Sequence, residues 1–306
     1  MKKFTKNKLV NNLKQEGLCF SEFSLFHEGE YALEDADWNY KDVPHLHFVH
    51  ELAEAFPAVV GDDIICTINL QKVLGLRFPL ALVNYESAKN TQTYYSTWLF
   101  YVLIIETSYE SITPTRTRVN TTYTFGHPKF LKFTFPILKW ILKRNYDNLM
   151  STDIPMRVRR GALRKKGYRF LKDGPSYSFE KTMDVTLTNV IIPPSEQAPN
   201  PTSIILKEVL PNDGDIVLGE DNHFGLRVIR SGNQLSLFQR MCLHEGASLD
   251  GQKCTNGTIL CPWHGRAFKP LAIFDTSVLQ PQVKNIDRFT FRLDSGELMI
   301  SYSVNL

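Results

Sequence analysis

Hydrophobic positions change their spacing along the chain, and each change predicts a different kind of element. In the first half, β-branched and aromatic residues alternate or cluster in residues 64–74, 94–106 and 115–125, separated by turn-like or polar stretches. Segments of this kind are typical of strands in an antiparallel sheet. The first part of the chain is therefore predicted to contain such a sheet.

The spacing changes after residue 128 to that of a long amphipathic helix. Pro136 suits the first helical turn. The apolar positions recur at three- and four-residue steps: Phe133, Ile137, Leu138, Ile141, Leu142, Tyr146 and Leu149. The polar side is basic, with Lys132, Lys139, Lys143, Arg144, Arg157, Arg159, Arg160, Arg164, Lys165 and Lys166. A helix packed on the sheet with a solvated basic face is the favoured interpretation, and a helix lying on an anionic membrane is the alternative.

A break in composition predicts the domain boundary. Residues 191–202 hold four prolines among polar residues, so this stretch can neither continue as a helix nor pair as a central strand. Beyond it, short strands with glycine-containing turns predict a small all-β domain: 224–230, 234–241 and 289–293. The predicted organisation is an α+β domain at 1–190, a linker at 191–202 and an all-β domain at 203–306.

Composition and charge exclude several classes of protein. At about 150 residues per domain, 306 residues allow two domains, and 43% hydrophobic with 22% charged residues is ordinary for a globular protein. A net charge of +3 is too small to imply a nucleic-acid partner. The longest apolar run, 98–105, falls far short of the roughly 20 residues that cross a bilayer, and the N-terminus lacks a signal peptide's apolar core. Five scattered cysteines argue for a reducing compartment, so we expect a cytoplasmic protein without a transmembrane segment.

Two cysteines and two histidines near the C-terminus have mirrored spacings. Cys242 precedes His244 by two residues, and Cys261 precedes His264 by three. In a Rieske centre one iron takes two thiolates and the other takes two imidazoles, so two loops each supply one ligand of either kind. A Cys2His2 zinc site is the alternative, but zinc motifs seldom combine these two spacings. The four residues are therefore predicted to hold a [2Fe–2S] cluster.

The run CPWHGRAF resembles the second ligand loop of the Rieske family. Respiratory and photosynthetic members carry a further cysteine in each ligand loop, and the pair forms a bracing disulfide. The corresponding positions here are Ala247 and Trp263, so the chain resembles the lower-potential Rieske domains of ring-hydroxylating oxygenases and their ferredoxins. The resemblance implies that electrons leave the cluster through His244 or His264.

A second histidine cluster lies in the first domain. Three of the eight histidines, His45, His47 and His50, fall within six residues. One interpretation is a polar helix start with Asp42 as N-cap and Pro44 in the first turn. On a regular helix His47 and His50 share a face better than His45 and His50 do.

The spacing Asp42-x-x-His45-x-x-x-x-His50 resembles the mononuclear-iron motif of Rieske oxygenase catalytic domains. That family completes a facial triad of two histidines and one carboxylate, which leaves open positions for O₂. The carboxylate comes from a late helix, and residues 151–160 resemble that segment. Asp153 is the predicted third ligand and Asp147 the alternative.

The order of elements also fits this family. An early histidine motif, a sheet and a long helix match the START-like helix-grip fold that houses the mononuclear iron, and Trp38-Asn39 stands where the family often has an Asn-Trp pair. In the family the Rieske domain usually precedes the catalytic domain, whereas here it follows.

The resemblance implies a Rieske non-haem iron oxygenase. Its [2Fe–2S] cluster would pass electrons to a mononuclear Fe(II), for O₂-dependent hydroxylation of an apolar or aromatic substrate. The alternative is a one-electron carrier fused to a metal-free ligand-binding or interaction domain. No G-x-G-x-x-G nucleotide fingerprint is present, so the electrons are expected from a separate reductase or ferredoxin.

Asp42 has a further expected role. In the oxygenase family a carboxylate just before the first histidine ligand connects it to a Rieske histidine of a neighbouring subunit. Asp42 holds that position relative to His45. The resemblance therefore implies a ring-shaped homo-oligomer, a trimer, in which His244 or His264 approaches Asp42 of the next chain. Transfer within one chain is the alternative, if the linker lets the C-terminal domain fold back.

Overall fold

The computed structural model describes residues 5–42, 45–50, 53–61, 64–73, 76–98, 100–170, 203–206, 213–286 and 289–302. These residues form two compact units, one within residues 1–165 and 170–186 and the other within residues 166–169 and 187–306. The predicted linker, 191–202, lies outside the described residues, so the boundary there stays a prediction. None of the described helices has the length and apolar character that a bilayer crossing requires.

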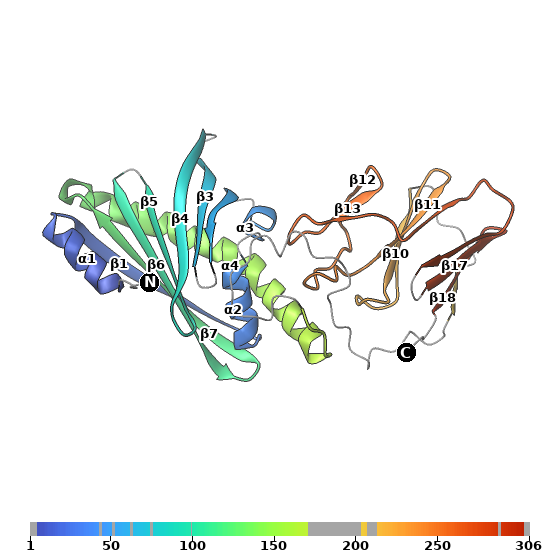
Figure 1. Ribbon diagram of the computed structural model, residues 1–306, viewed down its shortest axis with the longest axis horizontal. Coiled ribbons are helices and arrows are strands. Elements are labelled where there is room, and N and C mark those ends of the chain that lie inside the picture. Colours follow the sequence, from blue (N-terminus) through green and yellow to red (C-terminus); the bar gives the residue numbers. More distant parts are fainter. Residues whose placement is uncertain are drawn as a thin grey trace. The chain divides into compact units, whose positions relative to one another are not determined.

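The first unit is one antiparallel sheet gripped by a long helix (Figure 1). The strands run in the order β1-β7-β6-β5-β4-β3-β2, so β2 to β7 form a meander and β1 closes its far edge. The elements are α1 (Lys6–Gln15), β1 (Cys19–Gly29), α2 (Leu33–Lys41), α3 (His45–Phe48), β2 (Ala53–Val60), β3 (Ile64–Val73), β4 (Leu76–Ala88), β5 (Thr91–Trp98), β6 (Tyr101–Thr113), β7 (Arg116–His127), the 3₁₀ helix η1 (Lys129–Thr134) and α4 (Phe135–Lys165).

One predicted strand is wrong. Residues 94–106 were expected to form a single strand, but the chain reverses between Trp98 and Tyr101, which pair as the last rung of the β5–β6 hairpin. No glycine, proline, asparagine or aspartate marks this turn, so the usual hairpin signal is missing. The stacked rings of Trp98 and Tyr101, 6.3 Å apart, flank it instead.

The long helix is confirmed, and it extends beyond the predicted apolar series to Lys165. Pro136 lies in its first turn as expected. The helix packs on the sheet through a core of aromatic and aliphatic side chains: Phe23, Tyr123, Phe125, Tyr146 and Met150. A meander of antiparallel strands wrapped around one long C-terminal helix is the helix-grip arrangement, which confirms the predicted START-like fold class.

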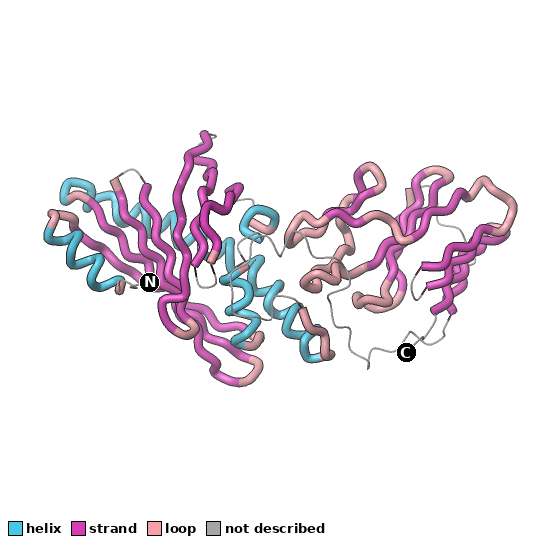
Figure 2. The backbone as a smooth tube through the Cα atoms, viewed as in Figure 1, coloured by secondary structure: helices cyan, strands magenta, loops and turns pink. Residues whose placement is uncertain are grey.

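The second unit is all-β, as expected (Figure 2). Two four-stranded sheets and one three-stranded sheet, ordered β15-β11-β10-β9, β16-β17-β18-β8 and β12-β13-β14, are antiparallel throughout. Buried residues of β10, β11 and β15 form one core with those of β17 and β18. The strands are β8 (Ser203–Leu206), β9 (Asp215–Leu218), β10 (Leu226–Ser231), β11 (Gln234–Gln239), β12 (Cys254–Thr255), β13 (Thr258–Leu260), β14 (Ala267–Phe268), β15 (Ala272–Asp275), β16 (Gln282–Ile286), β17 (Phe289–Asp294) and β18 (Glu297–Tyr302).

The basic side of the long helix is only partly solvated. Lys139, Lys143 and Arg144 are exposed as expected, but Arg157 and Arg160 are completely buried. Their partners explain this, because Arg157 donates to Asp153 and other acceptors while Arg160 lies near Asp35 and over the ring of Trp38. The second half of α4 therefore buries two cations, and each lies near a carboxylate.

His27 ties β1 to this interior. Its Nδ1 lies 2.6 Å from the Tyr146 hydroxyl and its Nε2 lies 2.8 Å from the Tyr31 hydroxyl. Burial, followed by the charge of Arg157, lowers the pKa of His27 from 6.5 to about 4. His27 is therefore neutral at pH 7.

This shift predicts a pH dependence of stability. Between pH 6.5 and about 4 the unfolded chain binds a proton at His27 that the folded chain does not. The free energy of unfolding is therefore unaffected by His27 above pH 6.5 and decreases as the pH falls through this window. The loss is roughly 3 kcal/mol. Hydrogen exchange of the amides of β1 and β7 measures this loss of stability. The protection of these amides should depend less steeply on pH in the His27→Gln variant than in the wild type. Parallel pH profiles of the two proteins would show that His27 does not contribute.

Candidate metal centres

The first ligand loop of the second unit follows β11. The Cys242 N–H donates to the Ala247 carbonyl and the Gly246 N–H donates to the Cys242 carbonyl, both at 2.8 Å. Gly246 has φ of +87°, a conformation that glycine adopts without steric cost. These bonds curl the loop so that Cys242 and His244 lie on a short, backbone-braced turn.

The second loop, between β13 and β14, repeats this construction. The Cys261 N–H donates to the Arg266 carbonyl at 2.8 Å, and the Gly265 N–H donates to the Cys261 carbonyl at 2.9 Å. Gly265 also has a positive φ, +64°. A cysteine, a glycine four residues later and the same two backbone bonds thus recur in both loops.

The two loops bring the four predicted ligands together. The thiols of Cys242 and Cys261 contact each other, and the rings of His244 and His264 lie 4.9 Å apart between centroids. Burial and the neighbouring thiol of Cys261 raise the pKa of Cys242. The hydrogen bond with Cys242 lowers the pKa of Cys261. Two buried sulfurs beside each other and two imidazoles beside each other fit a cluster with one thiolate-ligated and one imidazole-ligated iron.

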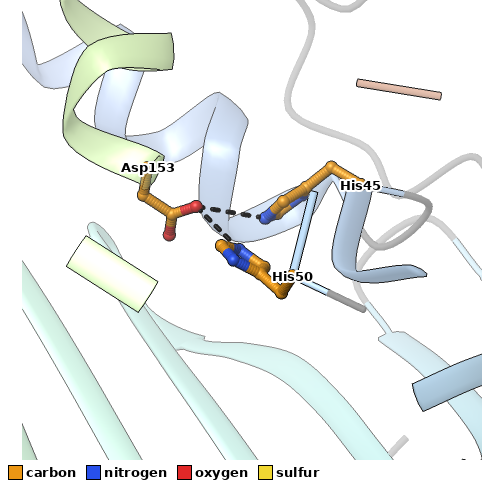
Figure 3. A group of neighbouring side chains, drawn as sticks. All are labelled: His45, His50 and Asp153. Carbon is orange, nitrogen blue, oxygen red and sulfur yellow. Dashed lines mark ion pairs between the residues drawn. The ribbon is translucent and has the colours of Figure 1, made fainter. Parts of the chain in front are cut away.

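In the first unit, His45, His50 and Asp153 converge (Figure 3). Asp153 Oδ1 lies 2.9 Å from His50 Nε2 and 3.5 Å from His45 Nε2. The three candidate ligand atoms all lie within 4.8 Å of one another. The structure thus brings together the three residues that the sequence singled out as iron ligands, and it places Asp147 on the exposed side of α4.

The shortness of α3 explains why histidines five residues apart can meet. The helix ends at Phe48, and His50 lies in the turn after it, so the argument from a regular helix does not apply. Asp42 is the C-cap residue of α2 rather than a cap that opens a new helix. Pro44 and the side chain of His47 lie outside the described part of the structure.

Hydrogen bonds orient both imidazoles. His45 Nδ1–H donates to the carbonyl oxygen of Asp42, whose carboxylate lies 3.7 Å from the same nitrogen. His50 Nδ1 lies 3.0 Å from Thr152 Oγ1, which gives its own proton to the Leu149 carbonyl. The Nδ1 atom of each imidazole is therefore held by an oxygen of the chain, and the Nε2 atom of each faces Asp153.

The three facing atoms are all possible metal ligands. His45 Nε2, His50 Nε2 and Asp153 Oδ1 are buried and face one another, and no hydrogen bond joins them to any other group among the described residues. Burial raises the pKa of Asp153, but contacts with the two histidines and the charge of Arg157 outweigh it and hold the pKa well below its ordinary range. Two imidazole nitrogens and a carboxylate are the donor set of a non-haem iron facial triad, so the residues present fit a divalent cation.

Arg157 fixes the carboxylate from behind. Its Nη2 lies 3.3 Å from Asp153 Oδ2, and it donates twice to Asn39 Oδ1, at 2.6 and 2.9 Å. The guanidinium also lies over the ring of Tyr40, 4.5 Å from its centroid. Oδ2 is thereby occupied, and Oδ1 is left to face the histidines.

A cavity of about 300 Å³ adjoins the triad, at the small end of the range for ligand pockets. His45 and Asp153 line it together with side chains of α4 and the sheet. Its aliphatic lining is Leu46, Ile65, Leu80, Leu82, Leu103, Ile105, Leu142, Leu149 and Met150, its aromatic lining is Tyr40, Tyr94, Tyr123 and Tyr146, and its uncharged polar lining includes Thr67, Asn69, Asn84, Ser96, Thr107 and Thr121. Among the described residues neither lysine nor arginine lines the cavity, which argues against an anionic ligand.

Residues 206–289 match the Rieske [2Fe-2S] domain family. This part of the second unit is therefore a Rieske domain, as predicted, and it supports a [2Fe–2S] cluster. Such a domain implies electron transfer with a partner. No curated protein sequence matches the chain.

Solved structures similar to part of this chain belong to proteins of several kinds. The Zhui aromatase/cyclase from Streptomyces sp. R1128 is 11% identical, with a TM-score of 0.41, covering 46% of this chain and 96% of the other. A START superfamily protein from Mycobacterium smegmatis is 10% identical (TM-score 0.38; 44% and 96% covered), and norcoclaurine synthase from Thalictrum flavum is 10% identical (TM-score 0.33; 43% and 92% covered). At these identities the likeness concerns the fold alone.

Sequence reasoning missed the residues that support the triad. Arg157 was assigned to a solvated basic face, although its four-residue spacing from Asp153 is the spacing of a helical ion pair. Asn69, whose buried Oδ1 has no hydrogen-bond partner among the described residues, carried no signal in the sequence.

The Rieske loops give the most direct test. His264→Ala or Cys261→Ala should abolish the Rieske EPR signal of the reduced protein and lower the melting temperature of the second unit, because the cluster also joins two loops of a small fold. A full signal in either variant would contradict the ligand assignment. Cys254→Ala is the matched control, since Cys254 lies in β12 outside both loops, and it should keep the signal.

Proposed function

We propose that the protein is a Rieske-type oxygenase. In this proposal the [2Fe–2S] cluster held by Cys242, His244, Cys261 and His264 passes electrons to a mononuclear non-haem iron site in the first unit, for O₂-dependent hydroxylation of an apolar or aromatic substrate. The observation that carries the proposal is the convergence of three buried candidate ligand atoms, from two histidines and one aspartate, beside a largely apolar cavity.

When bound there, Fe(II) would supply the activation of O₂. The chain's own residues set the conditions for that chemistry. The Asp42 carbonyl and Thr152 hold the two imidazoles with their Nε2 atoms inward, and Arg157 holds Asp153 as a carboxylate. The apolar side chains of the cavity exclude water and hold an apolar substrate beside the triad.

The polar residues of the cavity refine the substrate class. Asn69 Oδ1 is buried in the lining without a hydrogen-bond partner among the described residues. A buried acceptor of this kind is stable only with a donor. A neutral, mostly apolar substrate carrying one hydroxyl group satisfies it, and an anionic substrate is disfavoured because no lysine or arginine of the described residues lines the cavity.

The remaining parts of the proposal follow from the sequence. Electrons come from a separate reductase or ferredoxin, since the chain has no nucleotide fingerprint. The protein is proposed to be cytoplasmic, with O₂ and a small substrate as its other partners.

A second function is a one-electron carrier fused to a metal-free ligand-binding domain. The extent of the family match favours it, because that match covers residues 206–289 and nothing in the first unit. The two functions differ in iron content: an oxygenase should hold about three irons per chain and the carrier about two.

Metal analysis with EPR of the reduced protein decides between them. His50→Ala and Asp153→Ala should each remove the mononuclear iron and any O₂-dependent hydroxylation while leaving the cluster spectrum intact, because the two sites share no ligand. Asp147→Ala is the matched control on the same helix and should keep three irons. Loss of iron in Asp147→Ala alone would make Asp147 the ligand, and two irons in wild type would overturn the oxygenase.

Asp42 tests the route of the electrons. We propose a ring-shaped homotrimer in which Asp42 links His45 to a Rieske histidine of the neighbouring chain. Asp42→Asn keeps the carbonyl that accepts from His45, so both metal centres should stay loaded while single-turnover transfer from cluster to iron slows by at least about 100-fold. Transfer at the wild-type rate would remove Asp42 from the route, and a fully active monomer in sedimentation would contradict the ring.

A further inference from the structure

Exposed apolar side chains form a stripe along the start of the long helix. Ile137, Trp140 and Ile141 follow one another at three- and four-residue steps, so they share one face of α4. With two residues of η1 they make up the apolar stripe, whose members are between 41% and 73% exposed: Phe130, Phe133, Ile137, Trp140 and Ile141.

The stripe is not a core face that lacks its partner. The opposite face of the same helix packs on the sheet through Phe135, Leu138 and Leu142, and Leu142 also lines the cavity. The first half of α4 is therefore apolar on two sides, one facing the sheet and one facing solvent. Soluble proteins seldom expose a contiguous apolar surface of this kind unless something binds it.

Cations accompany the stripe, and acids are absent from it. Residues 128–146 contain no aspartate or glutamate. The basic residues there are all exposed: Lys129, Lys132, Lys139, Lys143 and Arg144. Lys139 Nζ lies 5.5 Å from the centroid of the Phe23 ring, and the Arg144 guanidinium lies 6.0 Å from that of Trp140. None of the five forms an ion pair with a described carboxylate, so their charge is not neutralised.

A second element extends this surface. The Tyr101 hydroxyl lies 2.8 Å from Thr134 Oγ1, at the end of η1, so the β5–β6 turn lies beside η1. Phe100 in that turn is 64% exposed. The surface thus has two origins in the chain, the turn and the helix.

We infer that the apolar stripe and its five cations dock the protein on an anionic membrane. Aromatic and aliphatic side chains enter the boundary between headgroups and acyl chains, while lysine and arginine bind anionic headgroups. A second copy of this chain is a poorer occupant, because it would place two unneutralised sets of five cations against each other. The inference does not depend on the proposed oxygenase activity.

Co-sedimentation of the full-length, cluster-loaded protein with vesicles tests it. The protein should bind phosphatidylcholine vesicles that contain about one third phosphatidylserine more tightly than vesicles of phosphatidylcholine alone, and added salt should weaken the binding. The double variant Phe133→Ser/Trp140→Ser should bind the anionic vesicles at least about tenfold more weakly, because it loses two aromatic groups that the membrane would bury.

Charge and position are controlled separately. Lys139→Gln/Lys143→Gln keeps the stripe but should weaken binding and reduce its salt dependence. Phe26→Ser is the matched control: Phe26 is 77% exposed on β1, and the strand's alternation places it on the sheet face away from α4, because its neighbour Leu25 packs with the helix. Phe26→Ser should bind as wild type does.

Three results would overturn the inference. The first is equal affinity of wild type and Phe133→Ser/Trp140→Ser for the anionic vesicles, with both folded by circular dichroism. The second is no binding of wild type to either vesicle. The third is a concentration-dependent dimer of wild type that the double variant dissolves, which would make a second copy the occupant of the stripe.

Discussion

The buried guanidinium of Arg157 is the interaction on which the first unit's candidate metal centre depends. It joins Asn39 of α2 to Asp153 of α4, and it also donates to the Tyr31 hydroxyl at 3.1 Å. A buried cation is tolerated only where acceptors surround it, so these contacts fix one geometry rather than many. Asp42 is the C-cap residue of α2, and its carbonyl binds His45 Nδ1. Arg157 therefore joins the helix that orients His45 to the helix that carries Asp153.

The two candidate centres differ in how far the sequence can predict them. Each Rieske loop holds a cysteine, a histidine and a positive-φ glycine within five residues and closes on its own backbone, so spacing alone conveys its structure. The triad unites residues about a hundred positions apart, and only the resemblance identified Asp153. One local signal was present: Tyr146, Met150, Asp153 and Arg157 follow at helical steps and are all buried, whereas Asp147 falls outside this series.

Tertiary contacts explain what the sequence could not convey. The turn before Tyr101 contains none of the residues typical of turns. The rings of Trp98 and Tyr101 stack on either side of it instead. No glycine in the sequence marks the end of α3 at Phe48. This helix end nevertheless determines that His45 and His50 lie close together. The burial of Arg157 and Arg160 depends on Asp153, Asp35 and aromatic rings from other parts of the chain. A pattern of charges along one helix cannot distinguish such paired cations from solvated ones.

Hydrogen bonds on the far side of each side chain hold the three candidate ligand atoms of the triad together. The Asp42 carbonyl and Thr152 take up the Nδ1 atoms, and Arg157 takes up the outer carboxylate oxygen. Asp153 Oδ1 faces both Nε2 atoms, at 2.9 and 3.5 Å, and these contacts together with the charge of Arg157 keep Asp153 a carboxylate. The three candidate ligand atoms all lie within 4.8 Å of one another, close enough for one ion to contact each of them. A divalent cation would take the place of the ion pairs among the three side chains, so the folded chain presents a preassembled donor set for a metal ion.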